Sequence, residues 1–178
     1  AAGSAGSAGG DGATGIAATF CRGREMNLIL WRHAEALDAA PGQDDLSRPL
    51  TPRGERQAQR VARWLSQRLA ESTRVLVSPA LHCRQTAAAL GKKSKTVPEL
   101  APDAQIQSLL DAAGWPDART PVLLIGHQPT LGLLAAYLLT GTPHSIAVKK
   151  GSVWWLRSRD REGSAGAVLH AVQSPDDC

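Results

Sequence analysis

The sequence predicts a single α/β domain in which helices cover both faces of a mainly parallel central sheet. Short apolar segments alternate along the chain with segments of helical periodicity, an order typical of parallel strands joined by crossover helices. The 178 residues, of which 43% are hydrophobic, suffice for one sizeable core. From residue 145 on, closely spaced apolar segments separated by turn residues indicate antiparallel strands that extend the sheet.

Apolar runs rich in β-branched residues predict the strands of this sheet. Three buried strands are expected at Asn27 to Trp31, Arg74 to Ser78 and Pro121 to Ile125. A short fourth strand should precede Glu99. The antiparallel strands are expected at Ser145 to Val148, Ser152 to Arg157 and Ala167 to Val172, with turns at residues 149–151 and 161–166.

Four helices are predicted between the strands from apolar residues that share one face. The clearest runs from about Pro52 to Glu71, with Thr51 as its cap and a proline in the first position, where it is well tolerated. The other three are expected at Ala80 to Leu90, at Ala104 to Ala113 with an end at Gly114, and at Pro129 to Leu139 with an end near Gly141.

Residues 1–25 differ in composition from the rest. They are rich in alanine, glycine and serine, and such a segment buries too little apolar surface to offset the entropy of ordering it. The segment also lacks the basic start and the apolar stretch of a signal peptide. We therefore expect a disordered leader over residues 1–25 and one folded domain over residues 26–178.

Charge and cysteine content narrow the function classes. The net charge of +4 is spread along the chain, and no basic run alternates with aromatic residues, so a nucleic-acid platform is not expected. Three cysteines, Cys21, Cys83 and Cys178, form no CxxC pair, which favours a reducing cytoplasm over a disulfide framework. No apolar stretch approaches the roughly 20 residues of a bilayer span, so no membrane partner is expected.

Polar residues follow three of the predicted strands directly. Arg32 and His33 follow the first strand, Ser78 to Thr86 follow the second, and His127 lies within the Gly126 to Gly132 segment after the third. Ligands of open α/β sheets bind beyond the carboxyl ends of the strands, so these residues are expected to share one crevice. A phosphoryl group fits them best, because arginine offers a planar fork to phosphate oxygens and neutral imidazole is a competent nucleophile.

Other chemistries lack a matching motif. Two histidines could also serve zinc, but no HxH, HExxH or Cys/His cluster supplies a third ligand at a usable spacing, so no metal is expected. The chain has no GxSxG elbow, Walker loop or GxGxxG loop, so a serine hydrolase and a nucleotide cofactor have no support.

Four segments in this order resemble the histidine phosphatase superfamily, and specifically its compact SixA-type phosphohistidine phosphatases. They are LWRHAEA at residues 30–36, LTPRGERQA at residues 50–58, SPALHCRQTA at residues 78–87 and LLIGHQPTLG at residues 123–132. The likeness extends from Met26 to about Val172 and implies a phosphoglycerate mutase-like fold. The chain lacks the large insertions of the bigger superfamily members, which favours the SixA type.

The resemblance implies a metal-independent phosphatase with a phosphohistidine intermediate. His33 would be the nucleophile, Arg32 would hold the phosphoryl oxygens, and His127 would donate a hydrogen bond to them. Glu99 matches the place where larger relatives keep an acidic proton donor, although compact members often manage without one. A surface carboxylate is an equal alternative for Glu99.

One position departs from the family pattern. The second phosphate-binding arginine normally stands four residues before the threonine of SPxxRxxxT, and here that position is His82. Arg84 lies two residues nearer Thr86, an offset of about 200° around a helix, so it cannot take the same place without a local change in the chain. His82 could bind phosphate as an imidazolium, which would favour activity at lower pH, or could mark a weakened enzyme.

Three functions follow as expectations. The first is a cytoplasmic phosphatase that removes phosphate from histidine on a signalling protein, by resemblance a histidine phosphotransfer domain. The second is a phosphatase of a small phosphoester. The third is a catalytically weak or silent module that binds phosphorylated ligands through Arg32, Arg84 and His127.

Overall fold

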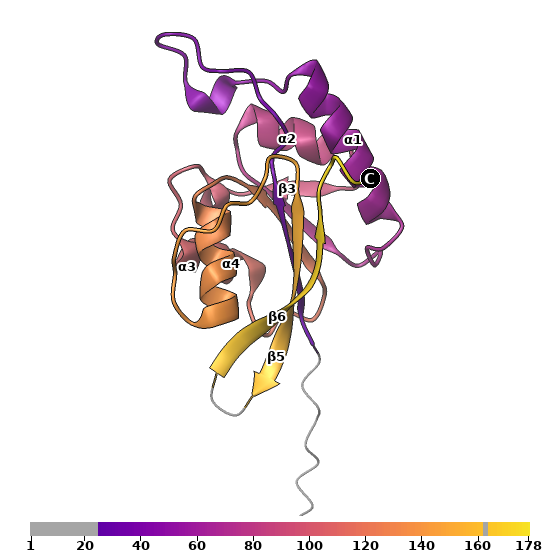
Figure 1. Cartoon of the computed structure of the whole chain (residues 1–178), viewed down its shortest axis with the longest axis vertical. Helices are drawn as coiled ribbons and strands as arrows, with labels where there is room; N and C mark the ends of the chain where they lie inside the picture. Colours follow the sequence, from indigo (N-terminus) through magenta and orange to yellow (C-terminus); the bar gives the residue numbers. More distant parts are fainter. Residues whose placement is uncertain (1–24, 162–163) are drawn as a thin grey trace, which may run out of the picture.

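The predicted α/β fold with its mainly parallel sheet is confirmed by a computed structural model, which describes residues 25–161 and 164–178 (Figure 1). One sheet has the strand order β3-β2-β4-β1-β5-β6. Strands β1 to β4 pair in parallel, whereas β5 pairs antiparallel with both β1 and β6. The predicted leader lies outside the described residues apart from Glu25, so its disorder stays a prediction.

The strands lie close to their predicted positions. They are β1 (Asn27–Arg32), β2 (Arg74–Val77), β3 (Ser94–Thr96), β4 (Val122–Gly126), β5 (Val153–Arg161) and β6 (Ser164–Gln173). The last two are longer than expected, because β5 extends to Arg161 and β6 begins at Ser164, within the predicted turn over residues 161–166. Residues 162–163 of that predicted turn lie outside the described part of the chain.

Four helices and two single 3-10 turns connect the strands. The helices are α1 (Pro52–Ser66), α2 (Leu81–Ala88), α3 (Ile106–Ala113) and α4 (Thr130–Thr140), and the turns are η1 (Asp45–Ser47) and η2 (Pro98–Leu100). Helices α3 and α4 end, as predicted, at Gly114 and Gly141, which take left-handed backbone angles of φ 74° and 86°. Among the described helices, none combines the length and the apolar sequence that a bilayer-spanning helix requires.

The sheet separates two apolar cores. Alternate residues of each strand point to opposite faces, so Ile29 and Trp31 of β1 contribute to one core while Leu28 and Leu30 contribute to the other. Helices α1 and α2 cover the first face, and α3 and α4 cover the second (Figure 1). Burial on both faces explains why β1 and β4 read as continuous apolar runs.

Helix α1 is shorter than predicted, because it ends at Ser66 and not near Glu71. Its start is as expected, with the Thr51 hydroxyl accepting the backbone N–H of Gly54. At its end the Leu65 carbonyl accepts the N–H groups of both Arg68 and Leu69, which closes the final turn. The chain then turns back toward β2. Residues 67–71 therefore lie outside the helix, although their sequence continues the helical pattern.

The strand predicted at Ser145 to Val148 is wrong, because these residues have no regular secondary structure and lie outside the sheet. Two of its carbonyl groups are taken by side chains, since Ile146 accepts a hydrogen bond from Gln128 Nε2 and Val148 accepts one from Arg32 Nη1, each at 2.7 Å. The segment therefore accepts hydrogen bonds from side chains at the ends of β1 and β4 and does not pair with a strand of the sheet.

Helix α1 approaches the chain after β1 so closely that Gly54 has no room for a side chain. A Cβ atom at this position would lie far inside van der Waals contact with the Glu35 carbonyl oxygen. The Glu35 carbonyl also accepts the N–H of Thr51 at 2.9 Å, and the Glu35 N–H donates to Gln57 at 3.0 Å. These contacts hold the segment that follows His33 against α1.

We predict that Gly54→Ala lowers the free energy of unfolding by about 2 kcal/mol, the scale of overpacking in a close-packed site. An exposed helical glycine would show the opposite sign, since alanine favours helix by about 1 kcal/mol. Urea denaturation measures the difference, and exposed Ser66→Ala at the other end of α1 is the control, with a change within about 0.5 kcal/mol. Stabilisation by Gly54→Ala would contradict the close approach.

Candidate active site

The carboxyl ends of β1, β2 and β4 lie at one edge of the sheet and bring the predicted segments together. The His33 N–H donates to the Gly126 carbonyl at 3.1 Å, and the Ser78 N–H donates to the Ile125 carbonyl at 3.0 Å. The parallel ladder thus continues one residue past each strand and aligns residue 33, residue 78 and His127.

Three histidines meet at this edge. The ring centroids of His33 and His82 are 4.3 Å apart, and each of these rings is 5.2 Å from the ring of His127. All three are buried, with His82 fully enclosed and the other two 6% exposed. We call His33, His82 and His127 the histidine cluster.

His33 is oriented by its own backbone. Its Nδ1 lies 2.8 Å from the carbonyl oxygen of Ala34, a distance at which Nδ1–H donates to that carbonyl. The proton is then fixed on Nδ1, and the Nε2 lone pair is left free. His33 therefore presents an unprotonated ring nitrogen, the form that can attack phosphorus.

His82 is held in the same way from helix α2. Its Nδ1 lies 3.1 Å from the carbonyl oxygen of Arg48, while its Nε2 is buried and has no hydrogen-bond partner. The hydroxyl of Thr86 donates to the His82 carbonyl at 2.7 Å and accepts the N–H of Ala34 at 3.1 Å. Thr86 thus joins α2 to the residue that orients His33.

His127 contacts the chain that follows β2. Its Nε2 lies 2.7 Å from the Ser78 hydroxyl and 3.4 Å from the Cys83 sulfur. Nδ1 of His127 takes part in none of the hydrogen bonds found among the described residues.

Burial raises the pKa of the Cys83 thiol, so Cys83 stays protonated and is a poor nucleophile.

Arg32 lies beside the cluster, as predicted, and has an unused donor. Its Nη1 donates to the Val148 carbonyl at 2.7 Å, which fixes the guanidinium, whereas its buried Nε has no partner. Buried N–H groups are rarely left unpaired in folded proteins. The Arg32 Nε–H is therefore a buried donor that has no partner among the described residues.

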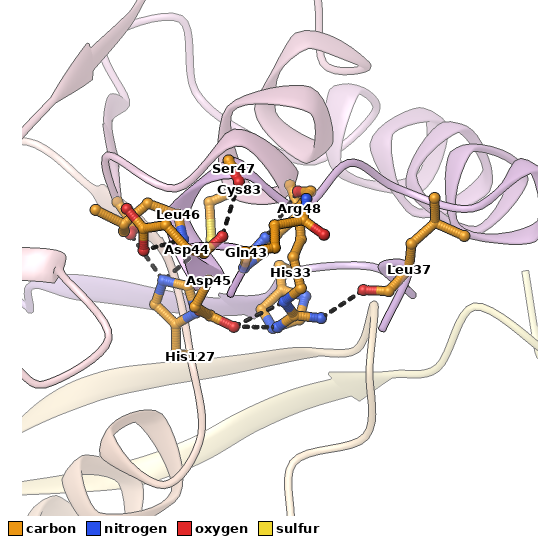
Figure 2. Close-up of polar contacts among 12 residues, drawn as sticks. His33, Leu37, Gln43, Asp44, Asp45, Leu46, Ser47, Arg48, Cys83 and His127 are labelled. Carbon is orange, nitrogen blue, oxygen red and sulfur yellow. Dashed lines mark hydrogen bonds and ion pairs between the residues drawn. The ribbon is translucent and has the colours of Figure 1, made fainter. Parts of the chain in front are cut away.

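Arg48 is a site residue that sequence reasoning missed. It donates from Nε to the Asp45 carboxylate at 2.7 Å and from Nη1 to the Leu37 carbonyl at 2.7 Å, so its guanidinium spans the loop between them (Figure 2). Its backbone carbonyl holds His82, and its charge contributes to lowering the pKa values of His82 and His127. Arg48 stands two residues before the family-like segment that begins at Leu50. This position is the one feature of the sequence that indicates a role in the site.

Two predicted residues are not brought to the cluster. Arg84 is exposed on α2, and no hydrogen bond or ion pair in the described structure connects it to the three histidines. Glu99 is exposed in η2 and lines a separate surface hollow with Arg74 and Lys93. The geometry thus supports the helical offset argued for Arg84 and leaves Glu99 without contact to the nucleophile.

Burial keeps the histidine cluster neutral. Desolvation lowers the pKa of His33 to about 3 and that of His127 to about 4, although the Ala34 carbonyl opposes the shift at His33. Desolvation also lowers the pKa of His82, so the free pocket disfavours its imidazolium form. The prediction that His82 binds phosphate as a cation thus depends on the bound anion raising this pKa.

The structure brings a third imidazole to the two histidines that the sequence motifs indicated. The sequence shows no local Cys/His motif, but His82 joins the two predicted histidines, and one ring nitrogen from each lies within 4.8 Å of the others. Residues that are distant in sequence thus form a set of three imidazole donors.

Comparison with known proteins identifies the family. Residues 28–107 match the histidine phosphatase superfamily (branch 1). The chain is 36% identical over 125 residues to phosphohistidine phosphatase SixA of Escherichia coli strain K12, covering 65% of this chain and 76% of the relative. It also matches a structure of the protein histidine phosphatase SixA complexed with tungstate, at a TM-score of 0.67 and 29% identity over 85% of this chain and 98% of that one.

A mycobacterial glucosyl-3-phosphoglycerate phosphatase shares the fold at a TM-score of 0.60 and 19% identity, over 82% of this chain and 97% of the other. The chain belongs to the histidine phosphatase superfamily, and it is a SixA-type member. The predicted phosphoglycerate mutase-like fold and the family resemblance are therefore confirmed.

The low pKa of His127 predicts how stability depends on pH. Below its ordinary pKa of 6.5 the unfolded ring binds a proton, whereas the folded ring stays neutral down to about 4. The unfolded state binds more protons in this window, so the free energy of unfolding falls as the pH falls. The contribution of this ring is about 2 kcal/mol between pH 7 and pH 5.

We therefore expect the free energy of unfolding of His127→Gln to fall by about 2 kcal/mol less than that of the parent protein when the pH is lowered from 7 to 5. Urea denaturation at pH 7 and pH 5, in buffers without phosphate, measures both differences. Equal losses in the two proteins would show that the folded ring is protonated like the unfolded one.

Proposed function

We propose that this protein is a metal-independent phosphatase that forms a phosphohistidine at His33 and acts on phosphohistidine of a cytoplasmic signalling protein. The observation that carries the proposal is the orientation of His33, whose Nδ1 is engaged by the Ala34 carbonyl while Nε2 is free. Its low pKa keeps this ring neutral, and therefore nucleophilic, throughout the physiological pH range.

Positive and polar groups around His33 match the charge of a transferring phosphoryl group. Arg32 offers its unpartnered Nε–H to the phosphoryl oxygens. We assign Arg48, whose carbonyl accepts the hydrogen bond from His82, the role of a second cation near the histidine cluster. His127 can donate from Nδ1 when the Ser78 hydroxyl donates to its Nε2. Such preorganised donors stabilise the charge that spreads over the equatorial oxygens. The tungstate complex of a SixA protein is consistent with a site for tetrahedral oxyanions.

The reaction proceeds in two displacements. The Nε2 lone pair of His33 attacks phosphorus, the bond from phosphorus to the leaving atom breaks, and the leaving group takes a proton. A water oxygen then attacks the phosphoryl group on His33, the phosphorus–nitrogen bond breaks, and its electron pair returns to Nε2. The water supplies one oxygen to inorganic phosphate and releases a proton to solvent.

Among the described residues no carboxylate is hydrogen-bonded to the histidine cluster, and this favours a phosphohistidine substrate. Glu99 has no contact with the cluster, and the Asp45 carboxylate is held by Arg48. An imidazole leaves easily once its nitrogen is protonated, so it needs less help than an alkoxide. The E. coli relative bears the name phosphohistidine phosphatase, which supports the same substrate. We therefore propose a histidine phosphotransfer domain as the partner.

We predict that the parent protein releases phosphate from a phosphohistidine-bearing phosphotransfer domain and that His33→Ala lowers the rate by at least about 1,000-fold, because the nucleophile is lost. Phosphate release is measured from pH 5 to pH 8. His144→Ala, which removes an exposed ring outside the cluster, is the matched control and should keep the parent rate.

Each alternative has its own outcome in this assay. Turnover of small phosphoesters without turnover of the phosphoprotein would establish the second predicted function, which the fold shared with glucosyl-3-phosphoglycerate phosphatase permits. Vanadate binding without any turnover would establish the phosphate-binding module. Faster release at low pH would support His82 acting as a cation.

The placement of Glu99 leads to a second prediction. Because its carboxylate is exposed and outside the cluster, Glu99→Gln should change kcat for the phosphoprotein by less than about twofold. Steady-state kinetics on the parent and the variant measure this ratio. A loss of about 100-fold would make Glu99 the proton donor that the resemblance to larger relatives suggested.

A further inference from the structure

We propose that His33, His82 and His127 form a binding site for a divalent transition-metal ion such as Zn²⁺, and that the bound metal blocks the phosphoryl pocket. The site is a property of this chain, because His82 stands where the resembled family has an arginine. With arginine in this position the pocket would contain only two imidazoles.

The donor geometry supports the site. One ring nitrogen from each histidine lies within 4.8 Å of the other two. Ligands of a tetrahedral zinc ion are about 3.4 Å apart, given Zn–N bonds of about 2.0–2.1 Å, so the ring nitrogens need to approach one another by at most about 1.4 Å around the ion. The set corresponds to the three-histidine zinc sites that keep a fourth position for water.

The outer contacts of the rings are those of metal-bound histidines. A ligating histidine usually donates its second ring N–H to a carbonyl, a carboxylate or water, which fixes the free nitrogen toward the ion. His33 and His82 donate from Nδ1 to the carbonyl groups of Ala34 and Arg48. The Ser78 hydroxyl can accept a hydrogen bond from the Nε2–H of His127, and Nδ1 of that ring then carries the lone pair for the metal.

His82 gives an independent indication of a ligand. His82 is 0% exposed, so its Nε2 cannot bond to solvent, and this atom has no hydrogen-bond partner among the described residues either. Buried polar atoms are rarely left unpaired in folded proteins, so such an atom calls for an explanation. A metal ion bound by the three rings would satisfy it.

The charges near the cluster permit a cation. Arg32 and Arg48 oppose it, but the Arg48 guanidinium forms an ion pair with Asp45 at 2.5 Å, and Arg32 is bonded to the Val148 carbonyl. The Asp45 carboxylate favours positive charge on His82 and His127. The Asp45 carboxylate thus offsets the charge of one of the two arginines, and the ion is bound mainly through the three neutral imidazoles.

Metal binding and phosphoryl transfer exclude each other. The ion would occupy Nε2 of His33, the lone pair that must attack phosphorus, so one pocket cannot hold both. This blocking effect rests on the proposed phosphatase function, whereas the metal site itself does not.

Zinc binding to the full chain is the direct test. The protein is dialysed against EDTA and titrated with ZnCl₂ by calorimetry, with the Co²⁺ absorption spectrum as a second readout. We expect one ion per chain, and affinity at least 10-fold weaker in His33→Ala and in His82→Arg, which removes the third imidazole but keeps a cation. His144→Ala is the control and should bind as the parent does.

His82→Asn separates a lost ligand from a disturbed fold, because the amide Nδ2 of asparagine takes the place of the ring Nδ1 and can still donate to the Arg48 carbonyl. It should lose affinity as His82→Arg does while circular dichroism reports an unchanged fold. Absence of zinc binding by the parent, or equal affinity in His82→Arg, would overturn the site.

Phosphate release in the same samples tests the blocking effect. We expect the parent rate to fall in proportion to zinc occupancy and to return with EDTA, and undiminished turnover at full occupancy would overturn this part. A parent protein that binds zinc through His82 but never releases phosphate would refute the phosphatase proposal and leave the metal site standing.

Discussion

The parallel pairing of β1 with β4 is the constraint on which the site depends. Register places Arg32 opposite Gly126, and the ladder extends by one more hydrogen bond from the His33 N–H to the Gly126 carbonyl. His33 and His127 are therefore placed side by side, because each comes directly after one of these two paired strands. A slip of one residue would reverse the faces of the apolar side chains of β1, so the two cores that fix the fold also fix the distance between these rings.

Burial gives the histidine cluster its chemical character. Three rings at centroid distances of 4.3 to 5.2 Å would repel one another as cations, and desolvation further disfavours their charged forms. Neutral rings with one nitrogen held by a backbone carbonyl are at once nucleophiles and metal donors. The same preorganisation thus supports both proposed properties, and which one operates depends on whether phosphate or a metal ion enters the pocket.

Most of the fold could be predicted from the sequence, because the patterns concerned are local. The apolar runs that form β1, β2 and β4, the Thr51 cap and the glycine ends of α3 and α4 depend on neighbouring residues. The errors occurred where distant contacts override the local pattern. Residues 145–148 look like a strand, but their carbonyl groups bind Gln128 and Arg32, which lie far away in the sequence.

Three features can be read from the sequence: the family, the strand ends that carry His33 and His127, and the replacement of an arginine by His82. Tertiary packing is needed to see that His82 turns into the pocket, that Arg48 contacts it from a distant loop, and that Arg84 and Glu99 stay on the surface. The physical reason is that motif spacing describes one segment at a time. Donor distances, burial and pKa values arise only when segments far apart in the chain are packed together.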